Sequence, residues 1–313
     1  MTSLLEFKQY VKKFYIRYET YITYVWKFLL ALVSILLINS KLGYMDALTN
    51  IAIVMMASLL CAILPPNFIV FVSAVFVLGH LYSLAIECTL IALIVFLLMF
   101  LLYFRFSPKD TLAVLLTPLF YFIGIPYVMP LAMGLLGNPT SIVSVSFGLV
   151  ISYMLSYFSS NATSFGSDGV EEAANEFSNI IGGMLGNKAM VVMIASFAIA
   201  LVIVYIIRRT SLDHSWKIAI AAGSITLIVA ILIGDMMSET QLSIGGVILG
   251  TIVSALLMLA LEFFAFNLDY SRTEKVQFED DDYYYYVKAV PKVTVATPER
   301  KVKKINRTRE RRS

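Results

Sequence analysis

The chain has 313 residues, of which 59% are hydrophobic and 14% are charged, and it carries a formal net charge of +3. Soluble domains have about 25% charged residues interleaved with apolar ones, so this composition excludes an ordinary soluble protein. Half of the basic residues, 12 of 24, follow residue 270, and beside a membrane they predict contact with membrane lipid or a protein, and no nucleic acid.

The first 21 residues form a basic and aromatic segment ahead of the first apolar run. We expect residues 1–21 to be a cytoplasmic amphipathic segment. The stretch Met1–Lys27 is long and mixed in charge, and no small-residue cleavage site follows it, so it is not typical of a cleavable signal.

Eight apolar segments are long enough to cross a bilayer, whose core of about 30 Å needs roughly 20 residues of helix. They predict an all-α polytopic membrane protein with four spans in residues 22–110 and four in residues 137–267. Pro65-Pro66 separates two of the spans, because proline cannot donate a backbone hydrogen bond and disfavours helix in the residue before it. The predicted spans are Ile22–Asn39, Ala47–Leu64, Asn67–Ile86, Thr89–Phe106, Pro139–Phe158, Ala189–Ile207, Lys217–Gly234 and Ile244–Asn267.

Residues 111–136 are apolar but are interrupted by prolines and glycines. A single crossing helix over this stretch would be badly kinked. The alternative is a re-entrant or broken helix, in which two short half-helices turn at Gly124-Ile125-Pro126. The interrupting residues are Pro118, Gly124, Pro126, Pro130 and Gly134.

The basic residues favour the re-entrant alternative, because Lys and Arg are enriched in cytoplasmic loops. With the N-terminus inside, four spans return the chain to the cytoplasm at Arg105 and Lys109. Only a segment that enters and leaves on one side then keeps Arg208, Arg209 and the basic tail inside. Both termini are therefore predicted to be cytoplasmic. Irregular backbone at membrane depth must be buried in protein or line a wet cavity, so residues 111–136 are a candidate functional segment.

The two sets of four spans run in the same sense in this topology, and their ends are similar. Leu78-Gly79-His80 parallels Ile233-Gly234-Asp235, and residues 101–106 parallel residues 261–266. A parallel 4+4 repeat would resemble the plan of repeat-built transporters. The alternative is a chance similarity between apolar helices.

Ionisable residues near the ends of spans are candidate binding residues, because they are costly within a membrane. His80, Glu87, Asp235 and Glu239 lie at the predicted outer ends of two hairpins. They predict an outer vestibule that binds a proton or cation. Interfacial residues that face headgroups and water are the alternative.

A GxxxG pattern at Gly246 and Gly250 predicts close helix packing in the last span. Packing within the chain is one use of such a pattern, and a homo-oligomer is the other. In the outer loop, residues 160–187, apolar residues from Val170 to Met184 recur at helical spacing. They predict an amphipathic helix that lies on the outer surface or covers a pore.

No catalytic motif is present, whether HExxH, GxSxG, GxxxxGK[ST] or CxxC. Cys61 and Cys88 fall in or beside apolar segments and are expected to be packed thiols. The two histidines, His80 and His214, lie on opposite predicted sides, so no metal centre is expected. We expect no enzyme activity and no cofactor.

The tail, residues 268–313, lacks the apolar residues of a core and is expected to be disordered when free. Its middle differs, because four acids at 279–282 precede Tyr283, Tyr284, Tyr285, Tyr286 and Val287. Consecutive aromatics followed by alternating Val and Lys form a strand template that can add to the sheet edge of a cytoplasmic partner. The alternative is a solvated linker with a polybasic membrane contact.

The run from Asp269 to Lys292 resembles the tail of uncharacterised clostridial (Firmicute) multi-pass membrane proteins, some of which are labelled ABC-transporter permeases. That resemblance implies a Gram-positive plasma membrane. No EAA-type coupling-helix motif occurs in the short loops Ser107–Asp110 and Arg209–Lys217. Two functions follow from the sequence. The protein is predicted to be a membrane subunit of a cell-envelope or transport assembly; the alternative is a solute permease or channel with a path between the two halves.

Overall fold

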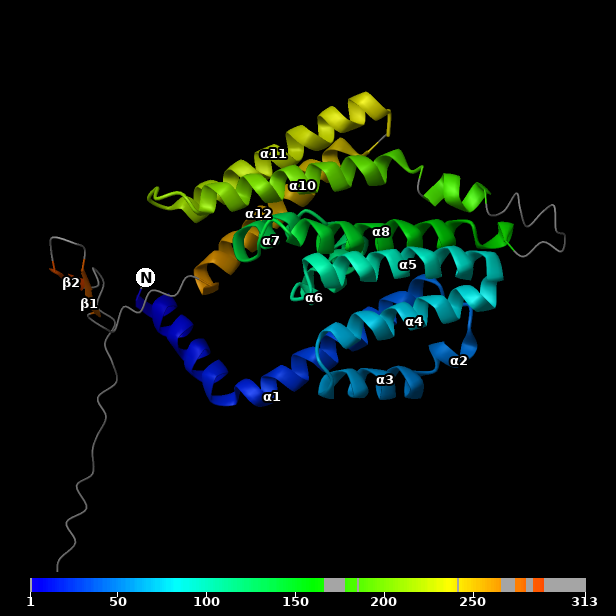
Figure 1. The fold of residues 1–313 in the computed structure, drawn as a ribbon, viewed down its shortest axis with the longest axis horizontal. Helices are drawn as coiled ribbons and strands as arrows, with labels where there is room; N and C mark the ends of the chain where they lie inside the picture. The colour runs from blue at the N-terminus through cyan, green and yellow to red at the C-terminus, as the bar shows by residue number, and fades with distance from the viewer. Residues whose placement is uncertain are drawn as a thin grey trace, which may run out of the picture. The chain divides into compact units, whose positions relative to one another are not determined.

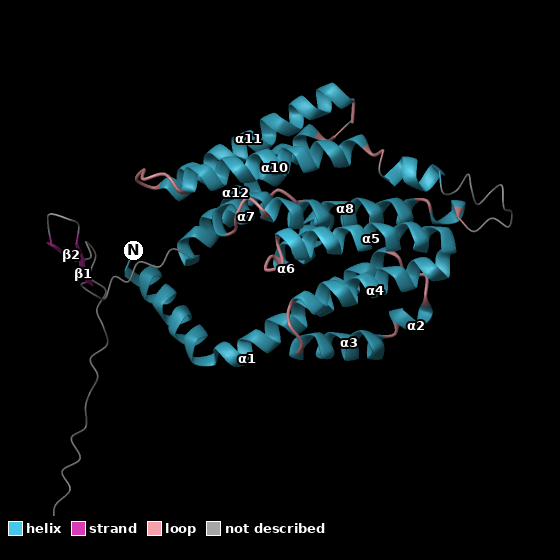
Figure 2. Ribbon diagram, viewed as in Figure 1, coloured by secondary structure: helices cyan, strands magenta, loops and turns pink. Residues whose placement is uncertain are grey.

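The computed structural model describes residues 2–165, 178–184, 186–240, 242–265, 274–279 and 284–289. The chain divides into two compact units, residues 19–263 and the two chain ends, 1–18 with 264–313. The described residues are almost entirely helical, which confirms the predicted all-α class, and strands occur among them only in the tail (Figures 1 and 2).

The helices of the first half are bounded as follows: α1 Thr2–Lys41, α2 Asp46–Thr49, α3 Ile51–Ile63, α4 Asn67–Leu84, α5 Ile86–Phe106, α6 Thr111–Ile123 and α7 Val128–Leu136. Those of the second half are α8 Ser141–Ser160, the 3-10 turn η1 Ala162–Ser164, a helical segment at 178–184, α10 Lys188–Arg208, α11 Ser215–Ser238 and α12 Ile244–Ala265. The tail holds β1 Glu274–Glu279 and β2 Tyr284–Ala289.

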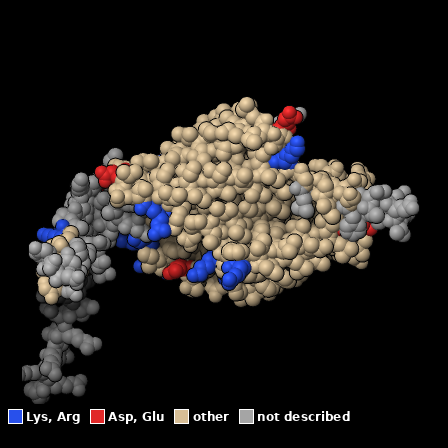
Figure 3. Space-filling view, turned by 45° about the horizontal axis from the view of Figure 1, so that its top comes forward, with Lys and Arg blue, Asp and Glu red and all other residues tan. Residues whose placement is uncertain are grey.

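Within the described residues, seven helices are long and apolar enough to span a membrane: α1, α4, α5, α8, α10 with its preceding segment, α11 and α12. Their outward faces are also apolar, since Leu101 on α5 is 69% exposed and Leu249 on α12 is 67% exposed. Figure 3 shows a broad face of the helical body without acidic or basic side chains. A large uncharged apolar surface of this kind is what lipid contact requires. The protein is therefore a multi-pass α-helical membrane protein.

The predicted span Ala47–Leu64 differs from the other seven, because it is broken into α2 and α3. Asn50 between them is extended (φ −62°, ψ 122°), and its side chain accepts a hydrogen bond from the N–H of Ala52. An asparagine that caps a new helix in this way ends the preceding one. The 13 residues of α3 measure roughly 20 Å, less than a bilayer core.

One end of the helical body gathers most of its basic residues, and we call it the basic end (Lys27, Arg105, Lys109, Arg208 and Arg209). Lys27 Nζ donates to the carbonyl of Leu64, three residues before α4 begins (3.0 Å). Tyr103 near the end of α5 is hydrogen-bonded to Asn67 at the start of α4 and to Thr111 at the start of α6. Ser107, just after α5, is hydrogen-bonded to Ser144 near the start of α8. The predicted segregation of basic residues to one end is therefore present in the fold.

The opposite end, which we call the outer end because the sequence predicts that it faces outward, holds the turns after α1, α4, α8 and α11. Tyr44 in the first of these turns donates from its hydroxyl to the carbonyl of Phe158 at the end of α8 (3.2 Å). Ser83 at the end of α4 donates to the carbonyl of Tyr44 (3.0 Å). The outer ends of α1, α4 and α8 are thus bonded together.

Helix α8 separates two buried apolar clusters. Phe147 and Leu155 pack with α1, α4 and α5, whereas Val145 and Leu149 pack with α7, α10 and α11. Gly148 lies against α6, where a Cβ atom would be 2.3 Å from Cβ of Thr117. The close approach of these backbones places α6 directly along α8, as small residues do in membrane helices.

The predicted repeat has one matching contact in the structure. Gly79 of α4 packs on Leu48 of α2, and Gly234 of α11 packs on Val192 of α10. In each half, a glycine of the third span therefore lies against the outer start of the second. The halves differ elsewhere, because α11 follows α10 closely along its length while α3 is short. The repeat stays a prediction.

The tail contains an antiparallel pair, in which Val276 is opposite Val287 and Phe278 is opposite Tyr285. This confirms the predicted strand over Tyr284–Val287, and its pairing partner lies in the same tail. Tyr283 and the other tail residues outside β1 and β2 are not among the described residues. The predicted disorder of the tail therefore stays a prediction.

Candidate functional site

Helices α6 and α7 form a hairpin that enters and leaves at the basic end. At its start, Ser107 lies before α6 and shares a hydrogen bond with Ser144 of α8 (2.6 Å). At its finish, Gly137 follows α7 and packs against Ser141, the first residue of α8. Both ends of the hairpin therefore meet the same end of α8. The two predicted half-helices are therefore present, and their re-entry into a membrane stays a prediction.

The turn between the half-helices is built on Gly124. This residue has φ +89°, in the left-handed region that favours glycine. The N–H of Ile125 bonds the carbonyl of Phe120 (2.9 Å), and that of Gly124 bonds Tyr121 (3.1 Å). These two bonds form a Schellman motif, which satisfies carbonyls at the end of α6. Pro126 follows, and its missing N–H removes a donor that would otherwise need a partner.

The tip of the hairpin packs against α12 at Gly250. A Cβ on Gly250 would lie 2.6 Å from the ring of Tyr127 and 3.2 Å from the carbonyl oxygen of Gly124. Gly246, the other half of the GxxxG pattern, is exposed, and a Cβ there would have only Ser243, the residue before α12, nearby. Gly250 therefore serves packing within the chain, whereas the face at Gly246 is open.

The prolines of the hairpin occupy positions of different cost to the helix. Pro118 lies inside α6, where it cannot supply the usual helical hydrogen bond to the carbonyl of Val114. Pro130 is the third residue of α7, in the first turn, where an N–H has no helical partner. Both side chains are buried. The two prolines are thus enclosed by protein, whereas Ile123 and Gly124 at the turn are exposed.

Arg208, predicted only as a cytoplasmic charge, has a specific structural role. Its guanidinium donates to the carbonyl of Gly137 (2.8 Å) and also to that of Leu135, both at the C-terminal end of α7. The last carbonyls of a helix lack partners inside it, and a cation there also complements the helix dipole. Arg208 of α10 therefore caps the returning half-helix.

A polar cluster closes the basic end beside the hairpin. The hydroxyl of Tyr103 on α5 lies 3.0 Å from Oδ1 of Asn67 and 3.2 Å from Oγ1 of Thr111. Thr111 also donates to Asn67. The three side chains begin or end α4, α5 and α6, so this cluster fixes the entrance of the hairpin relative to the first half.

His80 is fully buried and does not face an outer vestibule. Its Nε2 lies 2.8 Å from Oδ1 of Asn39, and its Nδ1 accepts from the N–H of Met45 (3.2 Å). These contacts assign the proton to Nε2, because Nδ1 must be the acceptor. The histidine joins α4 to the end of α1 and to the loop that follows it, which is a structural role.

The other three residues of the predicted vestibule have separate surroundings. Glu87 lies in the first turn of α5, where a carboxylate complements the helix dipole. Asp235 accepts from the N–H of Leu242 (3.0 Å) and from the hydroxyl of Thr240, so it organises the turn before α12. Glu239 ends α11 with φ +52°. Among the described residues, no contact joins these side chains to one another or to His80.

The described part of the outer loop agrees with the predicted amphipathic helix. Residues 178–184 are helical, with Ile180 and Met184 buried in the first cluster and Ile181 46% exposed. Tyr157 of α8 donates from its hydroxyl to the carbonyl of Asn179 (3.1 Å). The beginning of the predicted helix, residues 170–177, lies outside the described residues.

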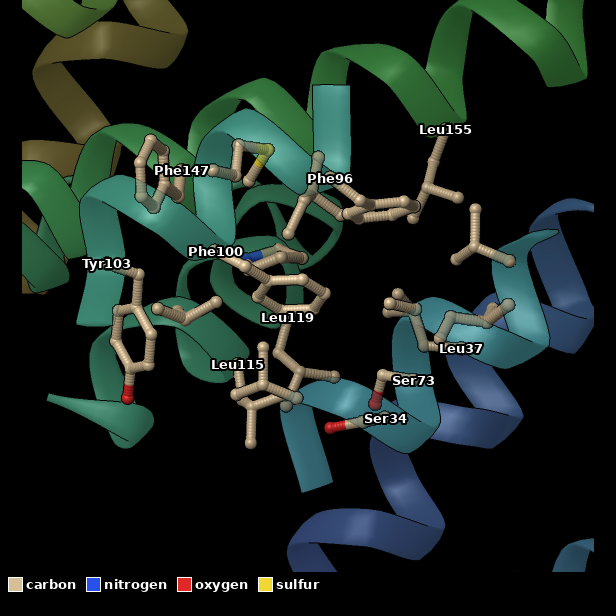
Figure 4. Close-up of a pocket in the computed structure, with 18 residues that line it drawn as sticks. Ser34, Leu37, Ser73, Phe96, Phe100, Tyr103, Leu115, Leu119, Phe147 and Leu155 are labelled. Atoms are coloured by element: carbon tan, nitrogen blue, oxygen red, sulfur yellow. The ribbon is translucent and has the colours of Figure 1, made fainter. Parts of the chain in front are cut away.

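A cavity of about 50 Å³ lies between α1, α4, α5, α6 and α8 (Figure 4). Its walls are apolar except for the hydroxyls of Ser34, Ser73 and Tyr103. The hydroxyls of Ser34 and Ser73 are buried without a hydrogen-bond partner, and no other polar side-chain atom in the described residues shares that condition. The sequence did not indicate this site, since single serines are ordinary in membrane helices.

Cys61 and Cys88 are buried thiols outside any disulfide, as predicted for packed cysteines. No group of three or more His, Cys, Asp or Glu side chains suited to a metal occurs among the described residues.

In the described tail, Tyr284 is 69% exposed, Tyr286 is 76% exposed and Val287 is 46% exposed. Comparison of the chain with protein-family models, with curated proteins and with solved structures finds no match in any of the three.

Proposed function

We propose that the protein is a plasma-membrane subunit of a cell-envelope or transport assembly, whose tail hairpin docks a cytoplasmic protein by strand addition. The observation that carries this proposal is the two-stranded hairpin with Tyr284 and Tyr286 exposed on β2. Both tyrosines lie on one face of the strand, because side chains alternate along it. Exposed aromatic anchors beside an open strand edge are typical of β-augmentation sites.

The stability of such a hairpin supports the same proposal. An isolated two-stranded hairpin is marginally stable at best in water, and a third strand is what makes a small sheet stable. Each strand here has one edge without a partner in the described residues. A cytoplasmic protein with an exposed sheet edge would supply the third strand.

The orientation in this proposal follows from the basic end. Lys27, Arg105, Lys109 and Arg208 lie together there, and the positive-inside rule assigns such an end to the cytoplasm. Helix α12 begins at the outer end, beside Leu242, and its 22 residues lead to the opposite end. The tail follows directly and shares the cytoplasmic side.

The test compares two tail variants of the full-length protein in native membranes after cross-linking. Tyr284→Ser with Tyr286→Ser removes the aromatic face, and Lys288→Gln on the same strand is the matched control. We expect one cytoplasmic protein to co-purify with the wild type and the control, and to fall at least tenfold with the double variant, measured by mass spectrometry. Equal recovery from both variants, or no recovered protein, would contradict docking.

A permease or channel is the second candidate, favoured by the hairpin of two half-helices that turns at Gly124. For this function, removal of residues 268–313 leaves transport intact and Gly124→Val abolishes it, the reverse of what docking requires. Release of ions or a small fluorophore from proteoliposomes distinguishes the two.

A further inference from the structure

The cavity among α1, α4, α5, α6 and α8 has two polar groups that nothing in the fold satisfies. Ser34 of α1 is 5% exposed, and its hydroxyl has no partner; the hydroxyl of Ser73 of α4 is likewise buried and unpaired. Both serines line the cavity, and Figure 4 shows them at one edge of the group of labelled apolar side chains. A buried hydroxyl without a hydrogen bond is rare in proteins, because burial without a partner is costly.

Five other buried hydroxyls in the described helices show what a serine or threonine in a helix commonly does. Ser58, Thr117, Ser152, Thr251 and Ser254 each donate to the carbonyl four residues earlier in their own helix. That bond is locally available to any serine or threonine in a helix. The hydroxyls of Ser34 and Ser73 do not make this bond to their own helix, and both residues line the cavity.

We propose that this cavity binds the oxygen-bearing end of an uncharged amphiphile, a hydrocarbon chain with one hydroxyl or carbonyl oxygen, whose oxygen bonds Ser34 and Ser73 while most of the chain stays in the bilayer. The walls select for hydrocarbon, because the remaining side chains are apolar or, at Tyr103, already hydrogen-bonded. They also select against charge, since no acidic or basic side chain lines the cavity, and an unpaired ion at membrane depth is expensive.

Water alone is a poor occupant. A buried water occupies about 10–15 Å³ on the same scale and needs two to four polar partners, so 50 Å³ has room for several. Two hydroxyls cannot supply partners for that many waters. A ligand with one oxygen and an apolar remainder matches both the two hydroxyls and the walls.

The position of the cavity supplies both a route and a connection to the hairpin. Ser73 and Leu37 are half-buried and Phe71, beside Phe100, is exposed, so this side of the cavity faces the lipid surface. On the other side, Leu115, Pro118 and Leu119 of α6 form the wall. An occupant would therefore enter from the bilayer and lie directly against the re-entrant half-helix.

The test uses the full-length protein in lipid nanodiscs and a ten-carbon primary alcohol that carries a photoreactive diazirine in its chain. A diazirine alkane of equal length, which lacks the hydroxyl, is the comparison probe. We expect the alcohol to label peptides of α4, α5 or α6 that line the cavity. Ser34→Ala with Ser73→Ala should reduce labelling by the alcohol at least fivefold while leaving alkane labelling unchanged.

Ser152→Ala is the control variant, because Ser152 is buried on α8 but bonds Gly148 and does not line the cavity. It should label as the wild type does. A second measurement guards against misfolding: the alcohol should raise the melting temperature of the wild type and of Ser152→Ala, but not that of the double serine variant. Equal labelling by alcohol and alkane, labelling independent of the two serines, or no labelling of the cavity would each overturn the proposal.

Discussion

The guanidinium of Arg208, at the end of α10, donates a hydrogen bond to the carbonyl oxygen of Gly137, just beyond α7 (2.8 Å). Together with its bond to Leu135, this contact satisfies carbonyls at the end of a half-helix, the nearer of them 71 residues earlier in the chain. It joins the hairpin to the second half of the protein.

Replacing Arg208 by Ala should destabilise the protein by about 1–3 kcal/mol, because part-buried carbonyls lose their donor. Arg209→Ala is the matched control, since Arg209 is exposed and bonds only the hydroxyl of Tyr205. Thermal unfolding of the purified protein in detergent measures both. Equal melting temperatures for the two variants would show that the cap contributes nothing.

Gly250→Ala should cost about 1–3 kcal/mol, because the added methyl group overlaps the ring of Tyr127. Gly245→Ala on the same helix should be neutral or stabilising, as nothing lies within 4 Å of its Cβ and alanine favours helix. The same unfolding assay compares them. If Gly245→Ala changed the oligomeric state in size-exclusion chromatography with light scattering, the exposed glycines would be an intermolecular contact instead.

His80→Asn should destabilise the protein by about 1–3 kcal/mol, since the shorter side chain cannot reach both Asn39 and Met45. His214→Asn is the control. His214 is exposed with φ +60°, a conformation that asparagine tolerates well. A stable His80→Asn variant that lost cation or proton binding would favour the vestibule over the structural role.

Cysteine accessibility tests the re-entrant arrangement in cells. Lys109→Cys comes before the hairpin in the chain, and Thr210→Cys comes after α10. Both should react with a membrane-impermeant maleimide only after permeabilisation. Asp46→Cys and Glu239→Cys, at the outer end, should react in intact cells. Cys61 and Cys88 are buried and should give little background. A single crossing by residues 111–136 would instead expose Lys109→Cys and Thr210→Cys on opposite sides.

Much of the fold was predictable because the forces that set it are local. Apolar length fixes the spans, and Gly124 with Pro126 fixes a turn that no straight helix accommodates. Asn50 was missed, since one polar residue in an apolar stretch is weak evidence of a break until its side chain is seen to cap Ala52.

The contacts at the candidate site were not predictable, because they join residues far apart in the chain. Arg208 meets a carbonyl 71 residues away, and His80 meets Asn39 across 41 residues. Ser34 and Ser73 carry no sequence signal, since only the packing around them decides whether a hydroxyl uses its own helix or faces a void. The outer vestibule was predicted from charge alone, and charge does not determine which neighbours a side chain has.

The hairpin of α6 and α7 has a consequence for how the architecture could change during evolution. A segment that returns to the side of the membrane from which it started does not change whether the number of crossings is odd or even. Removing both half-helices together would leave the direction of α8, α10, α11 and α12 across the membrane unchanged. If only one half-helix were lost and the other then crossed the membrane fully, the direction of all four helices would be inverted. The two half-helices are therefore constrained to be gained or lost as a pair.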